Sequence, residues 1–200
     1  MAETLEQIRE DLERLGKHMR VYDRGAYPAF YLQMHTPLRF SEISRIRLKD
    51  LCYIEDGNVK MVPDIVFEGK RLKLSSEERM ELAHCVLQRI PVTDTTEDVL
   101  SGYLCLSSID TPLSIQTYGK ILRRTCDELG FKKRYSSCDI RSLYGYFEIV
   151  SGRKTIDEVA LEYGVTQFYL LNRIFAGKEI RYADSLLNQV ANNKEAGKDD

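Results

Sequence analysis

The chain has 200 residues, and 43% of them are hydrophobic, which is enough to bury the core of one domain. It carries 29 basic and 31 acidic residues, a formal charge of −2, so it has no overall attraction to nucleic acid. Any DNA contact must therefore come from a local basic patch. Five scattered cysteines without a CxxC pair and three histidines without metal-ligand spacing predict reduced thiols, no metal site and no cofactor.

The N-terminal residues and the apolar runs of the chain bear on its location. The N-terminal residues are charged from the start, unlike a signal peptide. No apolar run approaches the roughly 18 residues that a membrane span needs. We therefore expect no membrane partner and a location in the cytoplasm or at the nucleoid.

The first fifty residues have the apolar periodicity of helices. Residues 3–19 carry apolar side chains at intervals of three or four (Leu5, Ile8, Leu12 and Leu15). Residues 27–34 are rich in aromatic and apolar side chains and predict a second helix. A third is expected to begin at Ser41-Glu42 and to carry Ile43, Ile46 and Leu48.

Residues 52–74 have the pattern of a small sheet. Asp56-Gly57 and Glu68-Gly69 are turn signals, and the segments beside them alternate as strands do. We expect three antiparallel strands here.

The remainder of the chain is predicted to be helical apart from a loop at residues 91–103. Helices are expected at residues 75–89, 114–129, 139–150, 155–163, 166–176 and 180–190. We predict one domain over residues 1–192 and a disordered polar tail over residues 193–200. The expected fold class is mainly α with a small three-stranded antiparallel sheet.

Residues 155–176 also fit a helix-turn-helix. Val159-Ala160 would lie on the first helix, Gly164-Val165 at the turn, and Leu170 and Ile174 in the packing of the second helix. A helix-turn-helix regulator is one interpretation of this pattern, but it leaves most of the upstream chain unexplained.

Two arginines occupy positions that favour an anionic partner. Arg39 precedes the helix predicted from Ser41, and a guanidinium at a helix entrance suits a phosphate. The alternative is a surface ion pair with Glu42. Arg141 lies within an apolar helix, where an unpaired charge is costly, so it needs an acidic side chain or a phosphate. The one dense basic run is Lys132, Lys133 and Arg134, for which the alternative is a solvated loop.

Three segments resemble, in order, the motifs of the tyrosine recombinase (phage integrase) catalytic domain. Residues 36–51, TPLRFSEISRIRLKDL, resemble the family's first box, T-G-L-R-x-S-E-x-x-x-L-x-x-x-D, with Pro37 in place of glycine. CDIRSLYGYF resembles the second box, H-x-L-R-H-x-F, at Ile140 and Arg141. EYGVTQFYLLNRIF resembles the segment that contains Leu-Gly-His and then the tyrosine. The two arginines are 141 − 39 = 102 residues apart, close to the family's spacing.

The resemblance implies a helical domain with a small sheet that acts on a DNA phosphodiester. In the family two arginines and a lysine neutralise the phosphate, histidine-like groups transfer protons, and a tyrosine forms a covalent 3′-phosphotyrosyl link. Arg39 and Arg141 match the two arginines. Lys70 is the best match to the lysine, with Lys60 and Lys73 as alternatives, and the basic run at residues 132–134 would add supporting charge.

The remaining positions depart from the family's pattern. The histidine-like positions fall on Cys138 and Val165, and the tyrosine position falls near Ile174. Tyr169 lies five residues too early and Tyr182 about eight residues late, so either could serve only as a displaced nucleophile.

We therefore expect a DNA-binding protein with an integrase-like fold that does not cut DNA. The alternatives are an active recombinase that uses Tyr182 or Tyr169, and a protein-interaction module whose arginines form internal ion pairs, with Glu42 or Asp139 as partners. Family members exchange C-terminal segments between protomers, which makes residues 180–192 the expected contact with a second copy or with other recombinase subunits.

Overall fold

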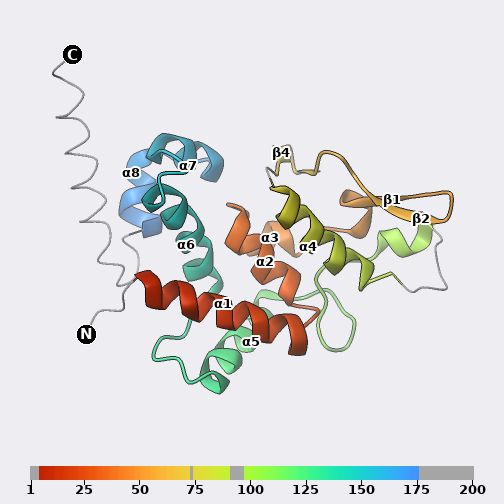
Figure 1. Cartoon of the computed structure of the whole chain (residues 1–200), viewed down its shortest axis with the longest axis horizontal. Coiled ribbons are helices and arrows are strands. Elements are labelled where there is room, and N and C mark those ends of the chain that lie inside the picture. Colours follow the sequence, from red (N-terminus) through yellow and green to blue (C-terminus); the bar gives the residue numbers. More distant parts are fainter. Residues whose placement is uncertain (1–4, 73, 91–96, 176–200) are drawn as a thin grey trace, which may run out of the picture. The chain divides into compact units, whose positions relative to one another are not determined.

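The computed structural model describes residues 5–72, 74–90 and 97–175. The chain divides into two compact units, Met1–Arg141 and Ser142–Asp200, and the boundary falls within helix α6 (Ser137–Val150). Figure 1 labels the elements of both units. No helix in the described part of the chain is long and apolar enough to cross a membrane.

The first unit is built on four helices of eight residues or more. These are α1 (Leu5–Tyr22), α2 (Tyr27–His35), α4 (Ser76–Leu87) and α5 (Ile115–Glu128). Helix α1 buries Ile8, Leu12 and Leu15 of the predicted apolar stripe at no more than 2% exposure, while Leu5 is half-buried. Met19, which was not in the prediction, extends the buried stripe. It packs against α2 and α5, and α2 also contacts α4 (Figure 1).

The strands form two hairpins. Strand β1 (Cys52–Glu55) pairs antiparallel with β2 (Asn58–Met61), and β3 (Val66–Phe67) pairs with β4 (Lys70–Arg71). Both connections are the predicted two-residue turns, and both residues of each turn have positive φ (51° and 72°, then 49° and 78°). This is the turn geometry that matches the twist of a hairpin. Among the described residues the hairpins are two separate sheets, so the expectation of a single three-stranded sheet was wrong.

The helix predicted from Ser41 through Leu48 is interrupted. The structure has a short α3 (Phe40–Ile43) and a 3₁₀ turn, η1 (Leu48–Asp50). Between them Arg47 is extended and forms a bridge with Tyr103. The Ile46 carbonyl accepts from the Leu104 N–H at 2.9 Å, and the Leu48 N–H donates to the Gly102 carbonyl at 2.9 Å. Long-range backbone pairing has therefore replaced continued helix.

Within the segment predicted as loop, η2 (Glu97–Ser101) is a 3₁₀ helix, and residues 91–96 lie outside the described part.

The second unit continues from α6 into three further helical segments. These are α7 (Ile156–Tyr163), α8 (Gln167–Tyr169) and the π-helical η3 (Leu170–Phe175). Thr155 caps α7 with its hydroxyl, and Gly164 ends it in the left-handed conformation at φ 66°. Of the residues in the helix-turn-helix pattern, Val159 and Leu170 are fully buried and Ile174 is half-buried. The expected second helix is a three-residue α8 followed by the π-helical η3. The helix predicted over residues 180–190 and the tail lie outside the described residues.

Candidate nucleic-acid interface

Arg39 lies on a tight connection between two helices. Helix α2 ends at His35, and Thr36 turns the chain by donating from its hydroxyl to the Leu32 carbonyl at 2.6 Å. Leu38 is fully buried, which anchors the connection, and Arg39 then precedes α3 with extended backbone. The Arg39 side chain is exposed, and its guanidinium makes no hydrogen bond or ion pair with the described residues. The charge of Arg39 is therefore presented to solvent from a fixed backbone position.

Glu42 fixes that backbone position. The Arg39 N–H donates to Glu42 Oε2 at 2.6 Å, which satisfies a donor at the start of α3. The other carboxylate oxygen, Oε1, accepts from Lys70 Nζ. Glu42 is 8% exposed, so a nearly buried carboxylate joins the connection after α2 to the start of β4. The ion pair expected as the alternative for Arg39 is therefore not formed by its guanidinium, because Glu42 bonds the Arg39 backbone instead.

Arg141 reaches the same connection from helix α6. Its Nε donates to the Pro37 carbonyl at 2.6 Å, a contact between residues 104 positions apart. Its charge also acts on Glu42. The side chain is half-buried, which agrees with its place in an apolar helix. The other predicted acidic partner, Asp139, accepts instead from the Ser136 N–H at 2.8 Å and from its hydroxyl at 2.5 Å, as a cap of α6.

The charges around Glu42 hold it ionised. Burial by itself raises the pKa of the Glu42 carboxyl. The hydrogen bonds from Lys70 and from the Arg39 N–H, together with the charges of Lys70 and Arg141, outweigh burial and leave the pKa below its ordinary value. Lys70 and Arg141 thus act on one carboxylate, and Arg39 starts from the same backbone connection.

The structure distinguishes two of the three candidate lysines, Lys60 and Lys70. Lys70 follows the β3–β4 turn directly, and its side chain is 41% exposed while it holds Glu42. Lys60 is on β2 and pairs with Glu55. Lys73 lies outside the described residues. Of the two described lysines, only Lys70 shares the Glu42 junction with the arginines.

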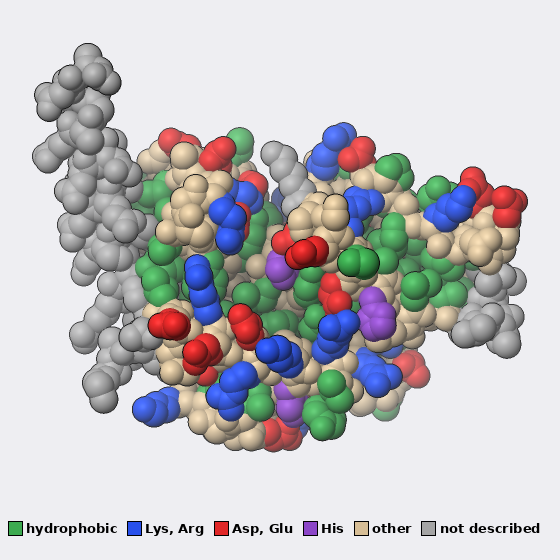
Figure 2. Space-filling model, in the orientation of Figure 1, with side chains coloured by type: hydrophobic (Ala, Val, Ile, Leu, Met, Phe, Trp, Pro, Cys, Tyr) green, Lys and Arg blue, Asp and Glu red, His purple; other side chains and the backbone are tan. Residues whose placement is uncertain are grey.

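Two of the three basic side chains at residues 132–134 already contact other side chains of the protein. Arg134 makes a two-pronged contact with Asp127, at 2.6 and 3.0 Å. Lys133 lies over the Tyr135 ring at 5.5 Å. Lys132 is exposed. The face drawn in Figure 2 likewise shows basic and acidic side chains interspersed, as expected for a chain with nearly balanced charge.

The residues at the family's proton-transfer and nucleophile positions do not have the side chains that DNA cleavage needs. Cys138 is an exposed thiol in the first turn of α6. Val165 donates its N–H to the Ala160 carbonyl at 3.0 Å, closing the end of α7, and Ile174 lies in η3. Neither aliphatic side chain can transfer a proton or attack phosphorus. Tyr169 is 51% exposed in α8, and Tyr182 lies outside the described residues.

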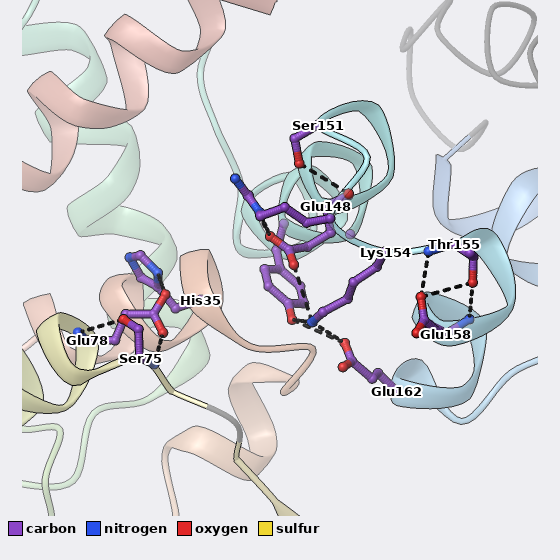
Figure 3. A network of polar contacts seen from close by, with 12 residues as sticks. His35, Ser75, Glu78, Glu148, Ser151, Lys154, Thr155, Glu158 and Glu162 are labelled. Atoms are coloured by element: carbon purple, nitrogen blue, oxygen red, sulfur yellow. Dashed lines mark hydrogen bonds and ion pairs between the residues drawn. The ribbon is translucent and has the colours of Figure 1, made fainter.

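The second unit contains a partly buried polar network that the sequence does not predict. Lys154 Nζ donates to the Tyr144 hydroxyl at 2.7 Å and to Glu162 at 2.9 Å, and it lies 3.3 Å from Glu148 (Figure 3). Burial raises the pKa of Tyr144 to about 12, with Lys154 opposing the effect and Glu162 adding to it. The network ties the loop after α6 to α7. No signal in the sequence predicts it, because its members are 4 to 18 positions apart on three segments with no common motif.

The comparisons with known proteins bear on the fold. The chain is similar to the XerA recombinase known from a crystal structure, with a TM-score of 0.63 and 13% sequence identity. The similarity covers 90% of this chain and 61% of that chain. No family model and no curated protein matches the sequence. The expected fold class is confirmed: the chain has a tyrosine-recombinase-like fold, mainly α with small antiparallel sheets.

Proposed function

We propose that this protein binds DNA through a phosphate clamp formed by Arg39, Arg141 and Lys70, and that it does not cut the strand. The observation that carries the proposal is the convergence of these three residues at Glu42. Three basic residues and one carboxylate contribute to this junction, so the excess of basic side chains would attract a phosphate. Arg39 would make the most direct contact, because its guanidinium has no partner among the described residues.

The residues at the other motif positions support binding without cleavage. Cutting a phosphodiester requires a nucleophile and a group that protonates the leaving oxygen. Valine and isoleucine stand at two of the positions matched to those roles, and an exposed cysteine stands at the third. A fold that keeps the positive groups but lacks the reacting groups would bind phosphate and leave it intact. The protein would then act in DNA recombination or integration as a non-cutting component.

The clamp is tested by comparing DNA binding of Arg39→Ala/Arg141→Ala with that of the parent protein. Fluorescence anisotropy with a labelled duplex should show affinity lowered by about tenfold or more, because each lost charged contact contributes about 1–3 kcal/mol. Lys17→Ala is the matched control, since Lys17 is 79% exposed on α1 and far in sequence from the clamp. Equal affinity of all three proteins would exclude the clamp.

Cleavage is tested with a suicide DNA substrate, whose nicked strand traps a covalent protein–DNA link. We expect no adduct on a denaturing gel. An adduct that disappears in Tyr182→Phe or Tyr169→Phe would instead establish an active recombinase with a displaced tyrosine.

A second candidate function, a protein-interaction module, is supported by the contacts that Glu42 makes within the protein. Glu42 accepts a hydrogen bond from Lys70, and the charge of Arg141 lowers its pKa. Internal ion pairs of this kind are what a protein-interaction module would contain. In that case Arg39→Ala would not change DNA binding, and a second copy or another recombinase subunit would be the partner. Residues 180–192, the proposed contact, lie outside the described residues.

A further inference from the structure

A separate cavity of about 400 Å³ lies in the first unit. The end of α1, the turn between α1 and α2, the segment after Cys105 and one face of α5 enclose it. Its size falls within the range of small-molecule sites. It shares no residue with the clamp at Glu42, so the clamp does not account for it.

Two contacts hold the wall of this cavity in place. Asp23 forms an ion pair with Arg124 of α5, and the Asp23 side chain is only 9% exposed. The Leu106 N–H donates to the Gly25 carbonyl at 3.0 Å. The packing at Gly25 is so close that an added Cβ would collide with the Leu106 carbonyl oxygen. The turn between α1 and α2 is therefore fixed against the opposite wall.

The cavity lining is rich in cations that lack partners. Arg24 and Lys120 are exposed and make no hydrogen bond or ion pair with the described residues, and the same is true of the Ser108 hydroxyl. Arg124 forms an ion pair with Asp23, and its Nε lies 3.6 Å from Glu128 Oε1. Glu128 is not part of the cavity lining. Three cations and one carboxylate line the cavity, so it carries a net positive charge.

Part of the remaining lining is apolar. Tyr22, Ala26, Leu106 and Ile121 contribute it. The Tyr22 side chain is 72% exposed, and its ring centroid lies 4.6 Å from that of the tilted His18 ring, so the Tyr22 ring is open to a ligand. Aromatic rings of this kind stack on nucleobases. The cavity therefore combines a cationic part with an apolar and aromatic part.

We propose that this cavity binds a nucleotide that carries a terminal phosphate. The phosphate would contact Arg24, Lys120 and Arg124, because arginine and lysine are the side chains that best match phosphate charge and geometry. The base would lie against Tyr22. A phosphate ion alone would leave most of the volume unfilled, and a nucleoside alone would leave the cations uncompensated. This site does not depend on the clamp at Glu42.

The proposal is tested by titrating the ¹⁵N-labelled full chain with adenosine 5′-monophosphate and following amide shifts. We expect shifts at Gly25 and Ser108, and at least about tenfold weaker binding of adenosine or inorganic phosphate alone. Arg24→Ala and Lys120→Ala should each weaken binding of the nucleotide by about tenfold, whereas Lys17→Ala should leave it unchanged. Absence of shifts with the nucleotide, or equal binding by all variants, would overturn the proposal.

The source of the nucleotide is resolved with two short single strands, one with a 5′-phosphate and one with a 5′-hydroxyl. If the phosphorylated strand binds more tightly than the mononucleotide and needs Arg24 and Lys120, the ligand is a strand end. If the mononucleotide binds as tightly, it is a free nucleotide. Arg39→Ala should bind the mononucleotide normally, so loss of the clamp and loss of this site give different results.

Discussion

Glu42 remains charged at 8% exposure because Lys70, Arg141 and one backbone N–H compensate it. An unpaired carboxylate at such burial would be unfavourable and would take up a proton. The converse also holds, because Lys70 and Arg141 lose a compensating charge if Glu42 is neutralised. The stability of this junction therefore depends on one ionised side chain.

We expect Glu42→Gln to lower the free energy of unfolding at pH 7 by about 1–3 kcal/mol, measured by urea denaturation. The folded-state pKa of Glu42 is lowered, so its contribution is present above the unfolded-state pKa of about 4.3 and is lost as pH falls through the folded-state value. The stability difference between parent and variant should thus be full near neutral pH and shrink below about pH 4. A difference that stays constant as pH falls would contradict the assigned ionisation.

At the scale of single residues, the sequence predicts which residues lie together at the Glu42 junction better than it predicts which atoms form the hydrogen bonds between them. The motif resemblance predicts that Arg39, Arg141 and Lys70 lie together, and the structure brings them to Glu42. The bond from Arg141 to the Pro37 carbonyl was not predictable. It joins positions 104 residues apart and involves a backbone atom, which carries no sequence signal.

At the scale of elements, the packing of α6 on α7 depends on Gly145. A Cβ there would lie 2.9 Å from the Tyr163 hydroxyl and 3.0 Å from Val159 Cγ1. The Tyr163 oxygen also accepts from the Gly145 N–H at 3.1 Å, so the ring is held close. Glycine destabilises the interior of a helix, and the close approach of α6 and α7 explains why a glycine stands at this position.

We expect Gly145→Ala to destabilise the protein by about 1–3 kcal/mol, because the new methyl group overpacks this contact. Gly119→Ala is the matched control, since Gly119 is also inside a helix, α5, and an added Cβ would meet nothing within 4 Å. That substitution should stabilise by about 0.5–1 kcal/mol. Urea denaturation of both variants would contradict the packing argument if they shifted in the same direction.

The Tyr144 network makes a prediction at alkaline pH. The folded-state pKa of Tyr144 is raised to about 12, so its contribution to stability is present below the unfolded-state value of about 10 and is lost as pH rises through the folded-state value. Tyr144→Phe should be less stable by about 0.5–1.5 kcal/mol at neutral pH and should lose less stability between pH 10 and 12. Parallel pH curves for parent and variant would show that the hydroxyl does not titrate there.

Elements were predictable where local chemistry decides them. Both hairpin turns follow from residue type, and the structure has both of them. The break in the helix after Ile43 and the separation of the sheet into two hairpins were not predictable. The break depends on pairing with distant backbone, as at Arg47 with Tyr103, and such pairing leaves no periodic pattern in the sequence.

At the scale of the whole molecule, the fold can be kept while the residues that cleavage needs are absent. The recombinase-like fold is present at 13% identity to the XerA recombinase, so the two chains share the fold with few identical side chains. A cleavage site needs particular groups at particular atoms, and substitution of one such group removes the reaction while the core remains. Under the proposed function, Arg39, Arg141 and Lys70 would hold a phosphate, and Cys138, Val165 and Ile174 would leave it intact.

The most direct test is the salt dependence of DNA binding by the parent protein and by Arg39→Ala. The exposed guanidinium has no partner among the described residues, so its loss should change stability by no more than about 0.5 kcal/mol. If Arg39 contacts a phosphate, the plot of log Kobs against log salt concentration should become shallower by about one in the variant, at every DNA sequence tested. An unchanged slope and affinity would contradict a phosphate clamp at Arg39.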